Sequence, residues 1–154
     1  MKLEQPQSPP AAAAVKQLLS RPAGERVREF KYRFAQSLVF GLPVLALHWF
    51  GLALGGPEAP RWTGLFQALL AGWIMYVAAA GLISEGALLL LRGRLTADLL
   101  VAGVAATVYM VGIAVWALLL WSGGPSRISM PFHYSVLILI VWCGVRWAWL
   151  ARAT

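Results

Sequence analysis

Histidines and methionines are the side chains of this sequence whose types and positions could hold a metal. His48 and His133 fall at the same end of two separate apolar segments, and Met110 and Met130 lie at a similar depth along theirs. Imidazole nitrogen with thioether sulfur suits Cu(I), and an imidazole can also ligate a haem or chlorophyll-type pigment. No ligand pair has i, i+4 spacing and no CxxCH motif is present, so the histidines can equally hydrogen-bond helices or headgroups. His48, His133 and Met130 are the candidate metal ligands.

The other reactive side chains do not assemble into a catalytic site. Cys143 is the single cysteine and has no companion His or Asp, so a nucleophile here lacks its base. Glu85 and Asp98 flank a loop that contains Arg92 and Arg94, which predicts an ion-pair cluster at the headgroup layer. Phosphate loops, paired carboxylates and serine triads are also missing from the sequence. We expect that the chain is not an enzyme.

The composition points to one membrane domain. The 154 residues are 60% hydrophobic, and mean hydropathy is +0.69, which is too apolar for a soluble domain of this length. The net charge of +7 could suggest nucleic acid, but the Lys and Arg residues are concentrated in the first 33 positions. They do not form a binding face, so we expect lipid and protein partners and no nucleic acid.

The apolar runs predict an all-α, four-helix transmembrane bundle. Its spans are expected at about residues 35–54, 62–91, 96–121 and 132–151, within a domain that covers 34–154. Residues 1–33 are expected to form a cytoplasmic tail, disordered to about residue 14, with two short helical stretches interrupted at Pro22. The second stretch has Phe30 on an apolar stripe and Arg33 away from it, typical of an interfacial basic helix. A plain positive flank of the first span is the alternative.

The positive charges predict the orientation. Eleven of the thirteen Lys and Arg residues fall in the tail, the loop that holds Arg92 and Arg94, and the end of the chain, whereas only Arg61 and Arg127 fall on the opposite side. Basic residues are enriched on the cytoplasmic side of membrane proteins. We therefore expect a multi-pass protein of the cell inner membrane with both termini in the cytoplasm.

Small residues predict where the helices approach one another. Four-residue spacings such as Ala68 with Gly72, and the run from Ala78 to Gly81, favour close packing of the second and third spans. Trp73 and Trp142 lie deeper than the other tryptophans, which fit interfacial belts. The candidate residues for packing on a partner subunit are Trp73, Trp142, Gly72 and Gly81.

Two stretches also carry a family resemblance. They are KYRFAQSLVFGLPVLAL (31–47), with its Leu42-Pro43-Val44 kink, and AGLISEGALLLLRGRLTADLLVAGVAATVY (80–109). Both resemble the first membrane helices of heavy-metal, copper-type P-type ATPases. In that family the second helix ends in a glycine, a Gly-Ala pair and a basic loop, matched here by Gly81, Gly86, Ala87, Arg92 and Arg94. The resemblance covers about residues 28–121 and, more loosely, a fourth helix in which Gly144 matches a family glycine.

The departures from the family pattern bear on function. The family's Asn-Met-Asp triplet is Thr96-Ala97-Asp98 here, and its two fourth-helix acids fall on Phe132 and Ala148. The sequence contains no DKTGT segment, TGE loop, nucleotide domain or Cys-Pro-Cys helix, so we expect no ATP-driven transport by this chain alone. The resemblance implies a helical scaffold that lost its transport chemistry, or a fragment completed by another chain.

These observations lead to one functional expectation and two alternatives. We expect a non-catalytic subunit that packs on and stabilises a larger membrane complex of respiratory or photosynthetic type. The first alternative is a copper-handling accessory that binds Cu(I) at the outer face or docks onto a metal transporter. The second is a truncated product with no selected role.

Overall fold

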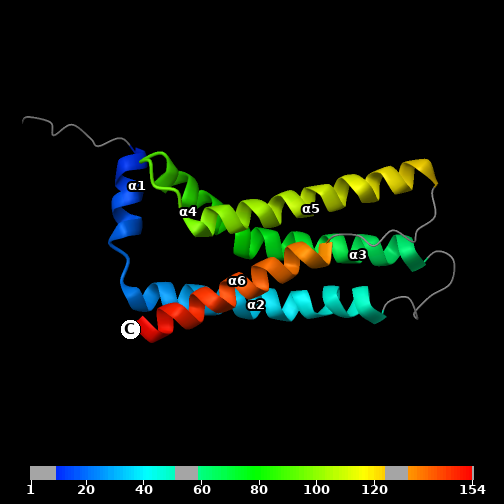
Figure 1. Ribbon diagram of the computed structural model, residues 1–154, viewed down its shortest axis with the longest axis horizontal. Helices are drawn as coiled ribbons and strands as arrows, with labels where there is room; N and C mark the ends of the chain where they lie inside the picture. The colour runs from blue at the N-terminus through cyan, green and yellow to red at the C-terminus, as the bar shows by residue number, and fades with distance from the viewer. Residues whose placement is uncertain (1–9, 51–58, 124–131, 154) are drawn as a thin grey trace, which may run out of the picture.

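The computed structural model describes residues 10–50, 59–123 and 132–153, and these are helical without strands. The long helices run up and down beside one another, and α1 together with the C-terminal end of α6 lies at one end of the bundle (Figure 1). In chain order the elements are α1 (Pro10–Leu19), α2 (Ala23–Phe50), α3 (Ala59–Ile74), the π-helical segment η2 (Met75–Ala79), α4 (Ala80–Leu90), α5 (Ala97–Ser122) and α6 (Phe132–Ala153). The predicted all-α class is confirmed.

Three of the helices are long and apolar enough to cross a membrane. They are Thr63–Leu90, which combines α3, η2 and α4, then Ala97–Ser122 and Phe132–Ala153. Their bounds agree with the predicted spans at 62–91, 96–121 and 132–151 to within a few residues. The chain therefore has the helices of a multi-pass membrane protein. The predicted span at 35–54 falls on α2, which is not among these three, and residues 51–54 lie outside the described part.

The first helix begins earlier than expected. The disordered part of the tail was expected to reach about residue 14, but α1 begins at Pro10, where a proline suits the first helical position because its missing N–H needs no partner there. The helix α2 runs through the expected boundary between residues 33 and 34 and through Pro43. The predicted interruption at Pro22 is confirmed, since it separates α1 from α2.

Small side chains build the interface of α3, η2 and α4 with α5, as the sequence predicted. Ala71, Ala78, Ala102 and Ala105 are fully buried there. Gly86 illustrates the tightness, because a Cβ atom at this position would lie 2.5 Å from the Cβ of Leu99. Close approach of backbones through small residues is the usual way in which membrane helices associate.

The segment η2 keeps one face of a long helix in register with its neighbours. In it the N–H of Ala80 donates to the carbonyl of Met75, the i to i+5 spacing of a π-helix. The extra residue lets Ala78 and Ala79 be buried together, and the buried positions then continue at Leu82 and Gly86. As a result the helix buries a continuous stripe from α3 to α4.

Candidate functional site

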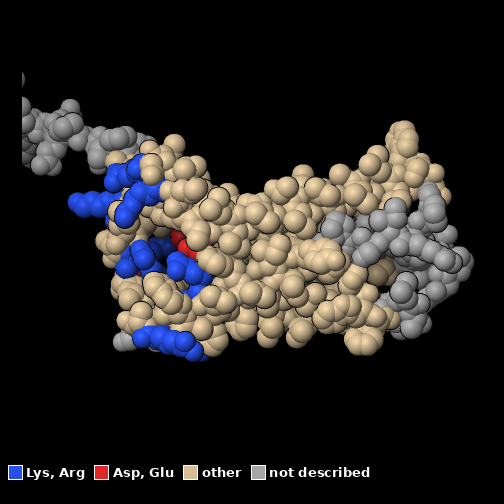
Figure 2. All heavy atoms as spheres, viewed as in Figure 1, with Lys and Arg blue, Asp and Glu red and all other residues tan. Residues whose placement is uncertain are grey.

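The charged residues gather at the end of the bundle where α1 lies. Figure 2 shows Lys and Arg clustered there with carboxylates recessed between them, while the rest of the visible described face is uncharged. We call this region the charged end. Two ion-pair networks organise it, one centred on Arg33 of α2 and one on Asp98 of α5.

Arg33 is the most buried cation of the charged end, with 7% of its side chain exposed. Its guanidinium pairs with Glu29 one turn earlier and lies 3.8 Å from Glu85 of α4, and Arg21 binds the same two carboxylates at 3.3 and 3.0 Å. The expectation that Arg33 lies away from the apolar stripe is wrong. It packs over the Phe30 ring and against Gly81, where a Cβ atom would lie 2.5 Å from its Nη2.

Asp98 holds the start of α5 against α6. Its carboxylate accepts hydrogen bonds from Nε and Nη2 of Arg146 at 3.0 and 2.9 Å, and from the indole N–H of Trp142 at 2.8 Å. Thr96 caps the same helix, because its hydroxyl accepts from the backbone N–H of Leu99. A bidentate arginine and an indole donor satisfy three acceptor positions of the carboxylate.

An ion-pair cluster was predicted here, but with the wrong cations. Glu85 and Asp98 were expected to pair with the loop residues Arg92 and Arg94, and they bind arginines from α2, the α1–α2 connection and α6 instead. Arg92 donates to the backbone carbonyl of Ala12 at 3.5 Å, a contact of the loop with α1. Arg146 could have been identified from the sequence as the partner of Asp98, because both residues are predicted to lie at the same depth in the membrane.

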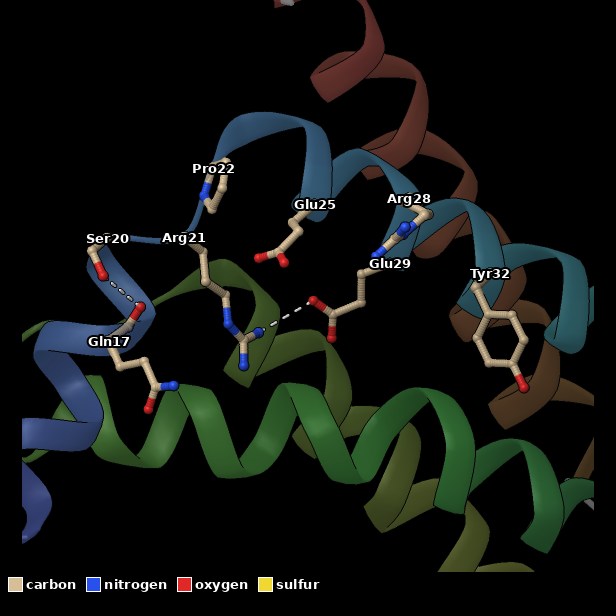
Figure 3. A pocket seen from close by; sticks show the side chains of 8 residues that line it. All are labelled: Gln17, Ser20, Arg21, Pro22, Glu25, Arg28, Glu29 and Tyr32. Atoms are coloured by element: carbon tan, nitrogen blue, oxygen red, sulfur yellow. Dashed lines mark hydrogen bonds and ion pairs between the residues drawn. The ribbon is translucent and has the colours of Figure 1, made fainter.

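Two cavities adjoin at the Arg21–Glu29 pair. The first, of about 780 Å³, is lined by residues of the α1–α2 connection and the start of α2, with Arg21, Arg28, Glu25 and Glu29 as its charged members (Figure 3). The second, of about 540 Å³, lies between α1, α2, α4, α5 and α6 and includes Asp98 and other residues of both networks. Both volumes fall within the range of small-molecule pockets.

Two of the three candidate metal ligands, His48 and His133, lie in contact. The rings of His48 in α2 and His133 in α6 stack at 3.5 Å between centroids with 14° between their planes. Met130 lies outside the described residues. Parallel stacked rings direct their nitrogens along parallel planes, so one imidazole must rotate before both can ligate the same ion. Within the described ranges no group of three or more His, Cys, Asp or Glu side chains could hold a metal.

Of the four residues expected at a partner interface, three pack against other residues of this chain and one lies on its surface. Gly72 lies under the Tyr109 hydroxyl, Gly81 under Arg33, and Trp142 donates to Asp98, so these three pack within the chain. Trp73 is 49% exposed. Its ring contacts Phe40 edge-on at 6.0 Å and Tyr76 at 6.1 Å, and Tyr76 is 72% exposed. Sequence reasoning missed Tyr76, although it lies close to Trp73 along the same helix.

Cys143 lies inside the bundle. It is fully buried among core residues of α6 and its neighbours. A buried thiol with no adjacent base has no route to a substrate. Glu29, Glu85 and Asp98 are therefore paired in the two networks, His48 and His133 stack on each other, and Cys143 is enclosed.

Comparison with known proteins gives no relative for this chain: no family model, no curated protein and no solved structure matches it.

Proposed function

We propose that this chain is a non-catalytic integral membrane subunit that packs on and stabilises a larger membrane complex of respiratory or photosynthetic type. In this proposal it crosses the inner membrane four times with both termini in the cytoplasm. The charge distribution supports that orientation, because ten Lys and Arg residues of the described ranges belong to the segments that form the charged end. The engagement of Glu29, Glu85 and Asp98 in ion pairs supports a structural role for the acids.

One surface feature carries the proposal: an aromatic patch formed by Trp73 and Tyr76. Both residues lie near the middle of the helix that runs from Ala59 to Leu90; Trp73 is half exposed and Tyr76 is mostly exposed. Tryptophan and tyrosine in membrane proteins prefer the two interfaces, where the polar atom of each ring reaches water. At mid-depth no such water is present.

The polar atoms of this patch need a covering partner. Among the described residues, neither the Tyr76 hydroxyl nor the Trp73 indole N–H makes a hydrogen bond. An unpaired polar group in hydrocarbon costs about 2–7 kcal/mol, whereas an acceptor on another helix would satisfy it. A second membrane subunit that covers Trp73 and Tyr76 therefore accounts for their position better than lipid does.

The test is affinity purification of the tagged full chain from its native membrane in mild detergent, with quantitative mass spectrometry of the proteins recovered. Wild type is expected to recover membrane subunits at a fixed ratio. The double variant Trp73→Ala, Tyr76→Ala should lose them, because it removes the aromatic surface and leaves every fully buried core residue in place. Helix content measured by circular dichroism should stay unchanged.

A matched control makes the result specific. Met110→Ala with Val111→Ala removes two exposed side chains near the middle of α5, 62% and 51% exposed, on another helix of the bundle. This variant should recover the same subunits as wild type. Recovery of wild type as a single species without partners, or equal loss in both double variants, contradicts the proposal.

A second candidate function is copper handling, favoured by the contact between His48 and His133. These residues are far apart in the sequence, yet their rings meet near the end of the bundle opposite the charged end. Rotation of one ring would place two imidazole nitrogens around a single Cu(I) ion, a soft cation that accepts imidazole and thioether ligands. Such a site fits the resemblance to copper-type ATPase helices.

Copper titration under reducing conditions separates the two candidates. The accessory function predicts one Cu(I) per chain that is lost in the double variant His48→Ala, His133→Ala and kept when Cys143 is replaced by Ala. Stoichiometric Cu(I) binding that persists without both histidines contradicts the assignment to this pair. Fixed-ratio subunits with no metal on this chain support the structural role.

A further inference from the structure

The cavity of about 540 Å³ at the charged end has an excess of positive charge. Four arginines line it, Arg21, Arg26, Arg94 and Arg146, together with three acids, Glu29, Glu85 and Asp98. Arg33, just outside the lining, adds a further cation to the same network through its contacts with both glutamates. Which of these cations remain available decides what the cavity can bind.

The carboxylates are already matched one to one by cations. Arg146 neutralises Asp98 through a bidentate contact, with the two hydrogen bonds at 2.9 and 3.0 Å. Arg21 and Arg33 share the two glutamates. These pairs leave no negative charge for the remaining arginines of the lining.

Arg26 and Arg94 are those remaining cations. The Arg26 guanidinium donates to the backbone carbonyl of Leu18 at 3.0 Å, which holds it at the α1 side of the cavity without neutralising it. Arg94, in the turn between α4 and α5, makes no ion pair with any residue that the structure describes. Two guanidinium groups that line the same cavity, one from the start of α2 and one from the α4–α5 turn, can therefore bind one anion, and guanidinium is the side chain best suited to phosphate oxygens.

The rest of the cavity wall is apolar. Leu19 of α1, Leu82 and Leu89 of α4, and Trp149 and Leu150 of α6 contribute to it. Leu82 is buried in the core, so the apolar wall reaches from the charged rim into the bundle. A free phosphate ion would leave this wall bare, whereas a molecule with a phosphate and hydrocarbon chains would contact both parts.

The neighbouring cavity provides an internal comparison. The charged residues that line it, seen in Figure 3, are Arg21, Arg28, Glu25 and Glu29, which balance. Its residues come from the end of α1, the α1–α2 connection and the start of α2, and its wall lacks the leucines of α4. Of these two cavities, the one that contains Arg94 combines the excess charge with the apolar wall.

We propose that the cavity of about 540 Å³ between α1, α2, α4, α5 and α6 binds an anionic phospholipid, with Arg26 and Arg94 on the phosphate and the leucines along the acyl chains. The site lies at the ends of membrane-spanning helices, where lipid headgroups are found. The bound lipid would join α1 and the start of α2 with the α4–α5 turn and α6, segments from different parts of the chain.

Native mass spectrometry of the purified full chain in detergent tests this. Phosphatidylglycerol and phosphatidylcholine with the same acyl chains are titrated separately, and inorganic phosphate in millimolar excess is the competitor. One basic side chain near an anionic lipid contributes about fivefold in affinity. The first phosphatidylglycerol should therefore bind about 25-fold more tightly to wild type than to the double variant Arg26→Gln, Arg94→Gln.

The control removes the same charge from the same end. Lys31→Gln with Arg152→Gln changes two exposed cations that do not line the cavity, and it should keep the preference for phosphatidylglycerol over phosphatidylcholine. Equal loss in both double variants, or an unchanged preference in the cavity variant, overturns the proposal. Complete displacement of the lipid by inorganic phosphate also overturns it, because the ligand would then be a free anion.

Discussion

Replacement of Asp98 by asparagine removes the negative charge that holds the first turn of α5 against α6. Asparagine keeps the size of the side chain and an acceptor for the Trp142 indole, but the two charge-assisted hydrogen bonds from Arg146 become weak. Such bonds are worth about 1.5–3 kcal/mol each when buried. Because the two side chains keep 29% and 21% of their exposure, screening lowers the sum, and we expect a loss of about 2 kcal/mol in unfolding free energy.

Reversible unfolding in mixed detergent, followed by tryptophan fluorescence, measures this loss. Glu25→Gln is the matched control, since it removes an exposed acid of the charged end that has no ion pair among the described residues. Arg146→Gln completes a double-mutant cycle, in which the coupling between positions 98 and 146 should account for most of the effect. A loss below about 0.5 kcal/mol in Asp98→Asn, or additive losses in the cycle, would refute the reasoning.

Three further predictions concern packing and orientation. Gly86→Ala should destabilise the chain by about 1–3 kcal/mol in the same unfolding assay, because the new Cβ atom meets the Leu99 Cβ at 2.5 Å, whereas Gly103→Ala has open space and should cost nothing. Tyr109→Phe removes a hydrogen bond of 3.2 Å to a carbonyl of α3 and should cost about 1 kcal/mol by thermal melting in detergent. Arg152→Cys, in a background without the native cysteine, should be labelled by a membrane-impermeant maleimide only from the cytoplasmic side, and labelling from the outside contradicts the proposed orientation.

The helices were predictable because their signals are local. Long apolar runs can satisfy their backbone groups in lipid only as helices, and this requirement located the three helices at 63–90, 97–122 and 132–153 that are long and apolar enough to cross a membrane. Gly93 and Gly123 have positive φ angles of 72° and 61° at the ends of helices, where glycine avoids the Cβ strain of this conformation. Small-residue spacing likewise indicated which spans pack closely.

The ion pairs were not predictable because they join residues that are far apart in the chain. Asp98 and Arg146 are 48 positions apart, and Arg21 and Glu85 are 64 positions apart. The sequence placed all of these residues at one depth in the membrane. Depth does not determine how each helix is rotated about its own axis, and therefore which neighbour each side chain faces. Local reasoning therefore assigned Glu85 and Asp98 to the nearest arginines along the chain, whereas the fold supplied arginines from other helices.

By itself the sequence determined the helical class, the approximate bounds of three long apolar helices and the clustering of basic residues, since hydrophobic length and charge position can be read along the chain. Tertiary structure alone decided which way each helix faces. Gly72 and Trp73 are adjacent in the sequence, yet one packs under Tyr109 and the other is half exposed. Neighbouring residues of a helix point about 100° apart, so only the packing of the whole bundle, with η2 adjusting one helix, could assign the first to the core and the second to the outer surface.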